Sequence, residues 1–145
     1  MYSVYEELIG KIIIKIDKCV NDDNNEDNIT FYLSNGEIYE LCHYDDCCES
    51  VSIEDINGDL DDLIGYKLIQ AEESYEDDKN ASESGTWSFY KFGTSKGYVT
   101  IRWYGTSNGY YSETASMNKI DKTLSIKELR NYKLCKIENI KKDSI

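Results

Sequence analysis

The chain has 145 residues, a formal net charge of -12, and a composition of 40% hydrophobic and 12% aromatic residues. A chain of this size forms one domain with a real core, and its apolar content excludes wholesale disorder despite the charge. No apolar run approaches the roughly 20 residues that span a bilayer, and no signal peptide is visible, so we expect a cytoplasmic protein without a membrane partner.

The negative charge is confined to one part of the chain. From Asp17 to Asp78 there are 20 acidic residues and two basic ones, whereas Lys79 to Ile145 holds 12 Lys and Arg against six acids. Such an imbalance produces a negative field that repels nucleic-acid phosphates and attracts cationic surfaces. We therefore expect no direct nucleic-acid binding, and a protein partner with a basic surface.

The first half of the chain predicts short strands separated by turns and one or two short helices. A helical turn that closes at Gly10 precedes the first β-branched run. Asn35-Gly36 is a strong hairpin signal, because a type I′ turn needs positive φ at both central residues. A short acid-rich helix is expected at 59–64. The strands expected here are 11–16, 29–34, 37–42, 51–54 and 67–73.

The second half predicts aromatic-rich strands joined by hairpins, at 87–92, 98–104 and 110–115, with turns around 95–97 and 108–109. The composition becomes Lys-rich after Met117, and Ser125 with Glu128 forms a capping-box pattern that predicts a short C-terminal helix. The fold class is therefore α+β, mainly an antiparallel sheet of six to eight strands built from hairpins, with two or three short helices. We expect one domain at 1–116 and a C-terminal extension at 117–145.

Residues 42–49 hold the only histidine, three cysteines and three carboxylates. Zinc accepts these ligand types, so the candidates for a metal site are His43, Cys47, Cys48 and Glu49. The spacing is poor, because there is no Cys-x-x-Cys pair and adjacent residues of an extended segment point in opposite directions. The preferred interpretation has no metal and no cofactor, one of the two adjacent cysteines in the core, and His43 bonded to a backbone carbonyl.

The five cysteines are an odd number in a chain without an export signal, which favours free thiols over a disulfide framework. A nucleophilic pair of Cys47 or Cys48 with His43, oriented by Asp45 or Asp46, can be drawn. Nothing beside these residues marks a helix N-terminus or an oxyanion donor. We therefore expect that the protein is not an enzyme.

The predicted hairpin at 98–115 offers a second candidate site. Strand alternation places Val99, Ile101 and Trp103 toward the core. If Asn108-Gly109 is a two-residue turn, the opposite face gathers side chains suited to a nucleotide or an aromatic anchor: Tyr98, Arg102, Tyr104, Tyr111 and Glu113. The competing interpretation is structural, with Arg102 paired diagonally to Glu113 between covering tyrosines.

Two long segments carry a family resemblance. The first runs from His43 to Val51 (HYDDCCESV) and on through residues 53–65 (IEDINGDLDDLIG). The second comprises residues 87–92 (WSFYKF), 96–105 (KGYVTIRWYG) and 107–112 (SNGYYS). Together they resemble the signature of a family of small uncharacterised bacteriophage and prophage proteins. The resemblance implies a phage origin and brings no assigned activity or catalytic residue.

Three functional hypotheses follow. The preferred one is an acidic phage accessory protein that inhibits a host protein, as an anti-defence factor of the anti-CRISPR kind. It would occupy a basic nucleic-acid-binding surface with a set of acids: Asp45, Asp46, Glu54, Asp55, Asp59, Asp61 and Asp62. The second is a small-ligand protein that sequesters a nucleotide signal on the Arg102 side of the hairpin, as a homo-oligomer. The third is a metal-binding protein or metalloenzyme at His43 and the nearby cysteines.

Overall fold

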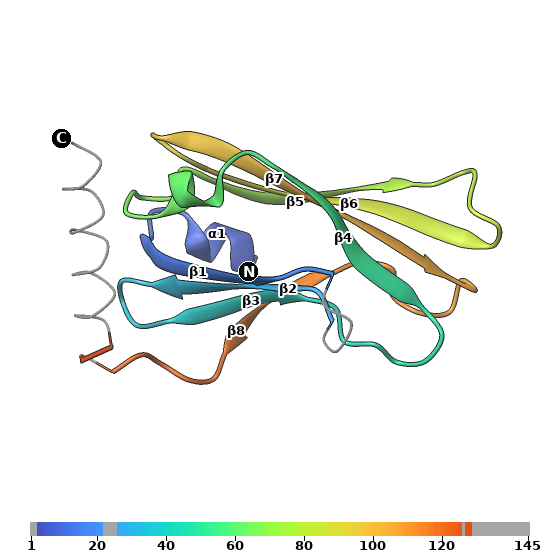
Figure 1. Ribbon diagram of the computed structural model, residues 1–145, viewed down its shortest axis with the longest axis horizontal. Coiled ribbons are helices and arrows are strands. Elements are labelled where there is room, and N and C mark those ends of the chain that lie inside the picture. Colours follow the sequence, from blue (N-terminus) through green and yellow to red (C-terminus); the bar gives the residue numbers. More distant parts are fainter. Residues whose placement is uncertain (1–2, 22–25, 126, 129–145) are drawn as a thin grey trace.

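Two four-stranded antiparallel sheets stack face to face in the computed structural model, which describes residues 3–21, 26–125 and 127–128 (Figure 1). The first sheet has the order β1-β2-β3-β8 and the second β4-β7-β6-β5. The strands of the first are β1 (Ile13–Cys19), β2 (Asn28–Leu33), β3 (Ile38–Cys42) and β8 (Ser116–Ile120). Those of the second are β4 (Ser50–Asn57), β5 (Gln70–Asp77), β6 (Ser84–Thr94) and β7 (Gly97–Ser107).

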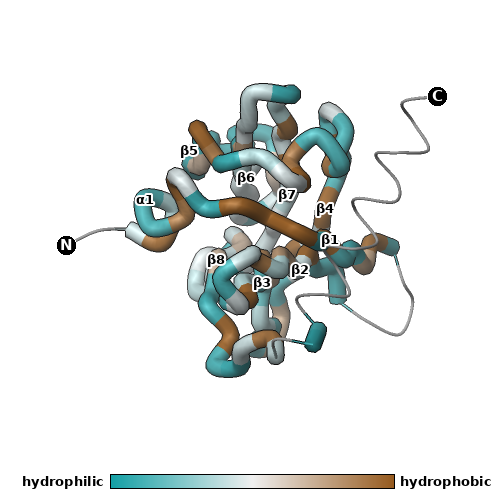
Figure 2. Tube along the Cα trace, turned by 90° about the vertical axis from the view of Figure 1, so that its left-hand side faces the viewer, coloured by the Kyte–Doolittle hydropathy of each residue, from teal (hydrophilic) through white to brown (hydrophobic). Residues whose placement is uncertain are grey.

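The core lies between the two sheets. Phe31 of β2 and Phe92 of β6 meet with ring centroids 5.4 Å apart, and Tyr39 of β3 and Trp103 of β7 are fully buried. In the end-on view of Figure 2, β4, β5, β6 and β7 lie above β2, β3 and β8, and β1 carries a hydrophobic run. Alternating apolar residues on facing strands therefore hold the sandwich together through burial of their inner faces.

Helix is scarce in the described residues. The α-helix α1 (Val4–Leu8) is capped by the Ser3 side chain, and the 3-10 helix η1 (Leu60–Leu63) is capped by Asp59. The expectation of mainly antiparallel sheet is confirmed, but the α+β class is wrong, because the described residues are nearly all β and hold very little helix. The segments that form α1 and η1 are each only about one turn long, which is too short to propagate a stable α-helix.

Two hairpins are confirmed. Leu33 and Glu37 flank the turn with a hydrogen bond from the Leu33 N–H to the Glu37 carbonyl. Gly36 has φ of 93°, but Asn35 does not have positive φ, so the expected type I′ turn is wrong. The Gly36 N–H instead donates to the Leu33 carbonyl, which makes Ser34 and Asn35 the central residues of the turn. Strands β6 and β7 pair from Thr94–Gly97 outward, so their connection is also a tight turn.

The hairpin expected at Asn108-Gly109 is wrong. After Ser107 the chain leaves β7, passes through 110–115 without forming a strand, and enters β8, which pairs with β3 in the other sheet. Gly105 permits this course, because an added Cβ there would overlap the backbone carbonyl of Glu113. The segment thus crosses over β7 instead of pairing beside it.

The packed part of the chain extends past the boundary expected at residue 116. That boundary falls at the first residue of β8, and Leu124 beyond it is buried against Ile14 and Ile38. The Ser125 hydroxyl accepts a hydrogen bond from the Glu128 N–H at 3.1 Å, as in a helix cap. The remainder of the expected C-terminal helix lies outside the described residues. Among the helices that the structure describes, none has the length and apolar character to cross a membrane.

Candidate functional site

The seven acids proposed for partner binding share one border of the second sheet. Strand β4 is an edge strand that pairs only with β7, and Glu54 and Asp55 lie on it. Asp45 and Asp46 lie in the segment just before β4, and the remaining acids lie just after it: Asp59, Asp61 and Asp62. All are exposed except Asp62, which is half-buried. We call these seven residues the acidic edge.

Two members of the acidic edge also have structural roles. Asp59 caps η1, with its carboxylate accepting a hydrogen bond from the Asp61 N–H at 2.9 Å. Asp55 forms an ion pair with Arg102 at 2.8 Å. Within the described ranges, Asp55 is the one member paired with a lysine or arginine. Asp46, Glu54 and Asp61 are exposed acids of the edge that face solvent and are available to a cationic partner.

The outer side of the second sheet carries an aromatic and arginine cluster. The Arg102 guanidinium lies 4.8 Å from the centre of the Trp87 ring, and Trp87 packs on Tyr104 at 4.4 Å. The Tyr104 hydroxyl donates to Asp78 at 2.5 Å, and this bond raises the pKa of Tyr104. Phe89, which pairs with Arg102 across the strands, completes what we call the Arg102 face. A shallow hollow of about 370 Å³ adjoins it.

Two residues expected on the Arg102 face are absent from it. Tyr98, Arg102 and Tyr104 do alternate on one side of β7, but Tyr111 belongs to the crossover after β7, not to a paired strand. Glu113 is buried and accepts hydrogen bonds from Thr86 at 2.8 Å and Ser107 at 2.5 Å. Burial opposes ionisation of Glu113, but hydrogen bonds led by the one from Ser107 lower its pKa. The diagonal Arg102–Glu113 pair is therefore wrong, because Glu113 anchors the crossover instead.

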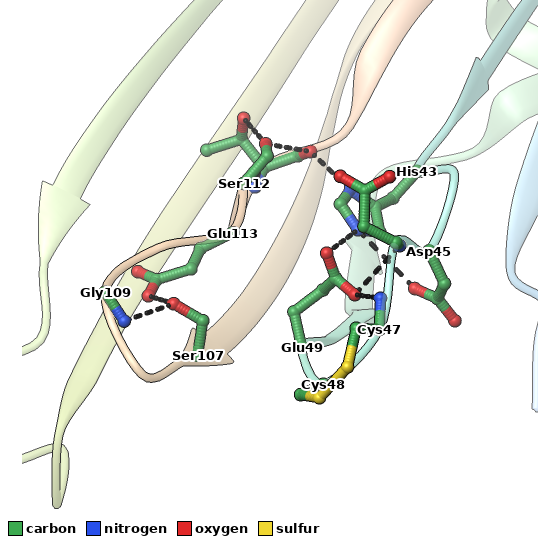
Figure 3. A network of polar contacts seen from close by, with 11 residues as sticks. His43, Asp45, Cys47, Cys48, Glu49, Ser107, Gly109, Ser112 and Glu113 are labelled. Atoms are coloured by element: carbon green, nitrogen blue, oxygen red, sulfur yellow. Dashed lines mark hydrogen bonds and ion pairs between the residues drawn. A yellow bond between two sulfur atoms is a disulfide. The ribbon is translucent and has the colours of Figure 1, made fainter.

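The loop between β3 and β4 gathers three potential metal ligands. His43 and Glu49 are buried, Asp45 is exposed, and one ligand atom from each lies within 4.8 Å of the others. Figure 3 shows the loop beside the segment 107–113, with the His43 ring turned toward Asp45 and Glu49. His43 Nδ1 also lies 3.0 Å from the Thr114 carbonyl, as the sequence suggested. We call His43, Asp45 and Glu49 the His43 cluster.

The two adjacent cysteines are not part of that cluster. Cys47 and Cys48 are joined in a vicinal disulfide, and both are exposed. The expectations of free thiols and of one core cysteine are therefore wrong for this pair. The polar residues around the two cysteines keep this loop at the surface. Neither cysteine therefore occupies a strand position that faces the apolar core.

Comparison with known proteins places the chain by family. The model of a domain of unknown function, DUF7448, matches residues 6–117. The chain belongs to the DUF7448 family. No curated protein and no solved structure matches it.

The DUF7448 match contains the acidic edge, the Arg102 face and the His43 cluster. It ends just inside β8, so the Lys119 side chain, which bonds to Glu37, lies beyond it. The candidate sites thus all belong to the family domain, and the closing strand of the first sheet is completed by residues outside the match.

Proposed function

We propose that this DUF7448 chain is a non-enzymatic binding protein whose acidic edge occupies a basic, nucleic-acid-binding surface on a host protein. The observation that carries the proposal is the set of exposed carboxylates on and beside β4, of which only Asp55 is paired with a lysine or arginine among the described residues. An edge strand that carries a row of negative charge can dock against a cationic groove.

The biological setting forms part of the same proposal. The sequence motifs resemble those of bacteriophage and prophage proteins, so we propose that the protein acts in the cytoplasm of an infected or lysogenic bacterium. There it would block a host defence protein, such as a nuclease, by competing with nucleic acid for its basic surface.

The competing explanation is that the acids only keep the sheet edge soluble. Charged edge strands prevent edge-to-edge aggregation, and β5 at the opposite edge is also acidic. The two explanations differ in where the negative charge is needed. Solubility depends on charge at both edges of the sheet, whereas docking depends on charge at β4.

The test compares charge reversal on the two edges. Glu54→Lys with Asp61→Lys changes β4 and its flank, and Glu72→Lys with Glu76→Lys makes the same charge change on β5. Host proteins captured by the wild type should lose binding to the β4 variant at least tenfold and keep binding to the β5 variant. Binding should also fall steeply between 0.1 and 1 M salt, because the screening length shrinks from ~10 to ~3 Å. Equal losses in both variants, or salt-independent binding, would refute the docking mechanism.

A second candidate function is sequestration of a nucleotide signal on the Arg102 face, by an oligomer of this chain. It is favoured by the stacking of Arg102 on Trp87 and by the buried Arg102 Nε atom, which has no hydrogen-bond partner. Carboxylates of Asp55 and Asp78 border the face and would repel a phosphate. Arg102→Ala should abolish binding in a screen of cyclic nucleotides, while retained binding would eliminate this candidate.

A further inference from the structure

The His43 cluster contains two buried polar atoms that have no hydrogen-bond partner, His43 Nε2 and Glu49 Oε2. His43 is 6% exposed, and the Glu49 side chain is 0% exposed. A buried carboxylate oxygen without a donor loses its hydration with no compensating bond, so such an atom calls for an explanation. Here both atoms belong to the same pocket and face each other.

The tautomer of His43 follows from its other ring nitrogen. Nδ1 lies 3.0 Å from the Thr114 carbonyl oxygen, which can only accept, so Nδ1 carries the proton and donates it. In the neutral ring Nε2 then presents a lone pair toward the two carboxylates. This is the arrangement in which metal-binding histidines are held, with the second nitrogen fixed by a backbone carbonyl.

Glu49 is oriented by its own loop. Its Oε1 atom accepts hydrogen bonds from the Asp46 and Cys47 backbone N–H groups, both at 3.0 Å. Oε1 is thereby satisfied, and Oε2 is left beside His43 Nε2 without a donor. The loop thus holds a carboxylate oxygen against the ring nitrogen.

The distances between the ring nitrogen and the carboxylates are longer than hydrogen bonds and match those between two ligands of one cation. His43 Nε2 lies 3.4 Å from Asp45 Oδ1 and 3.5 Å from Glu49 Oε2. Both exceed the usual 2.7–3.2 Å range of N–H···O bonds. Two ligands bonded at ~2.1 Å to one tetrahedral ion are separated by roughly 3.4 Å, which follows from zinc–nitrogen and zinc–oxygen bond lengths. The separation of the ring nitrogen from each carboxylate oxygen therefore equals that between two ligands of one tetrahedral ion.

We propose that His43, Asp45 and Glu49 bind one divalent transition-metal ion of the zinc class. One imidazole and two carboxylates favour zinc or a similar ion over calcium or magnesium, which prefer oxygen ligands alone. Asp45 is exposed, so the fourth position opens to solvent and can hold water. The sulfurs of Cys47 and Cys48 are bonded to each other and supply no thiolate.

The ligand set differs from the one that the sequence suggested. His43 and Glu49 are retained, Asp45 joins them, and the two cysteines leave. The binding site lies in the β3–β4 loop. A metal there would form one bond to each of the three side chains and so satisfy the atoms that have no hydrogen-bond partner. Asp45 belongs to both the acidic edge and the His43 cluster. The docking test changes Glu54 and Asp61 and the zinc test changes residues of the β3–β4 loop, so the failure of one proposal can be told from the failure of the other.

The test is zinc titration of the untagged full chain without reductant, after treatment with a chelator. We expect one equivalent bound, with a raised melting temperature. Asp45→Asn should weaken zinc binding at least tenfold, and Glu49→Gln should do the same. The matched control is Asp46→Asn, which removes the same charge from the neighbouring exposed position and keeps the backbone N–H that holds Glu49.

Two readouts make the result specific. His43 is the only histidine of the chain, so its imidazole proton resonances report directly on coordination and should shift with zinc. Cobalt(II) bound in place of zinc should lack the intense near-ultraviolet band of a cobalt–thiolate bond. The proposal is overturned if no zinc binds, if the His43 resonances do not move, if a thiolate band appears, or if Asp46→Asn weakens binding as much as Asp45→Asn. Asp45 is exposed, so its variant should fold even if Glu49→Gln does not.

Discussion

Glu37 joins three parts of the first sheet, and its carboxylate offers a direct test of the electrostatics. It accepts hydrogen bonds from Lys11 at 2.7 Å, Lys119 at 2.6 Å and Asn35 at 2.6 Å. Lys11 precedes β1, Glu37 lies in the β2–β3 hairpin and Lys119 belongs to β8. The bonds from Lys11 and Lys119 lower the pKa of Glu37 from 4.5 to about 2.

The magnitude follows from linkage between ionisation and folding. A shift from 4.5 to about 2 corresponds to at most ~3.4 kcal/mol, at 1.36 kcal/mol per pKa unit. Both lysine side chains are partly exposed, 30% for Lys11 and 54% for Lys119, so solvent screening reduces the expected contribution to ~1–2 kcal/mol. Since the folded-state pKa is depressed, this stability is present above about pH 4.5 and is lost as the pH falls toward 2.

The experiment is urea unfolding of the wild type and of Glu37→Gln between pH 7 and pH 2.5. The variant should be ~1–2 kcal/mol less stable at pH 7, and the gap should shrink steadily below pH 4.5. Glu54→Gln, on an exposed carboxylate of β4, serves as the control and should change stability by less than ~0.5 kcal/mol. A gap of constant size across the pH range, or no gap at pH 7, would refute the assignment to charge pairing.

Three further substitutions test the packing. Gly105→Ala should destabilise the fold by ~3 kcal/mol, because the new methyl group meets the Glu113 carbonyl; thermal unfolding unchanged from wild type would disprove the close crossing. Tyr90→Phe removes the donor that bonds the Ala115 carbonyl at 2.5 Å and should cost ~1–2 kcal/mol in denaturant unfolding, a loss below ~0.5 kcal/mol being inconsistent with that bond. Phe92→Ala should lower the free energy of unfolding by ~3–5 kcal/mol, and a smaller effect would mean that the contact with Phe31 is not central to the core.

The parts of the fold that local chemistry determines were predictable. Asn35-Gly36 marks the position of its hairpin, although not the turn type, and the alternation along β7 places Val99, Ile101 and Trp103 in the core as expected. The course after Ser107 was not predictable, because Asn108-Gly109 has the same local signal as a true hairpin. What decides there is tertiary, namely the bonds of Glu113 to Thr86 and Ser107 and the free edge of β3 that β8 completes.

The candidate site shows the same division. The sequence identified His43 and Glu49 as metal-ligand candidates, and it placed Asp45 among the surface acids and as a possible orienting partner of His43, not among the metal ligands. Their convergence depends on backbone N–H groups of residues 46 and 47, which orient Glu49, and on the Thr114 carbonyl 71 residues from His43. Residue types give no information about either contact, so the cluster could be assembled only from the folded chain.

The placement of β8 has a consequence for synthesis of the protein. Strand β3 ends at Cys42, but the strand that covers its edge ends at Ile120, so roughly 80 residues must follow before the first sheet can close. At translation rates of ~5–20 residues per second, that edge stays open for roughly 4–16 s on each ribosome. Neighbouring nascent chains could pair with it during this interval. Slow decoding between β3 and β8 should therefore increase aggregation of the newly made protein, even though the finished molecule buries the edge.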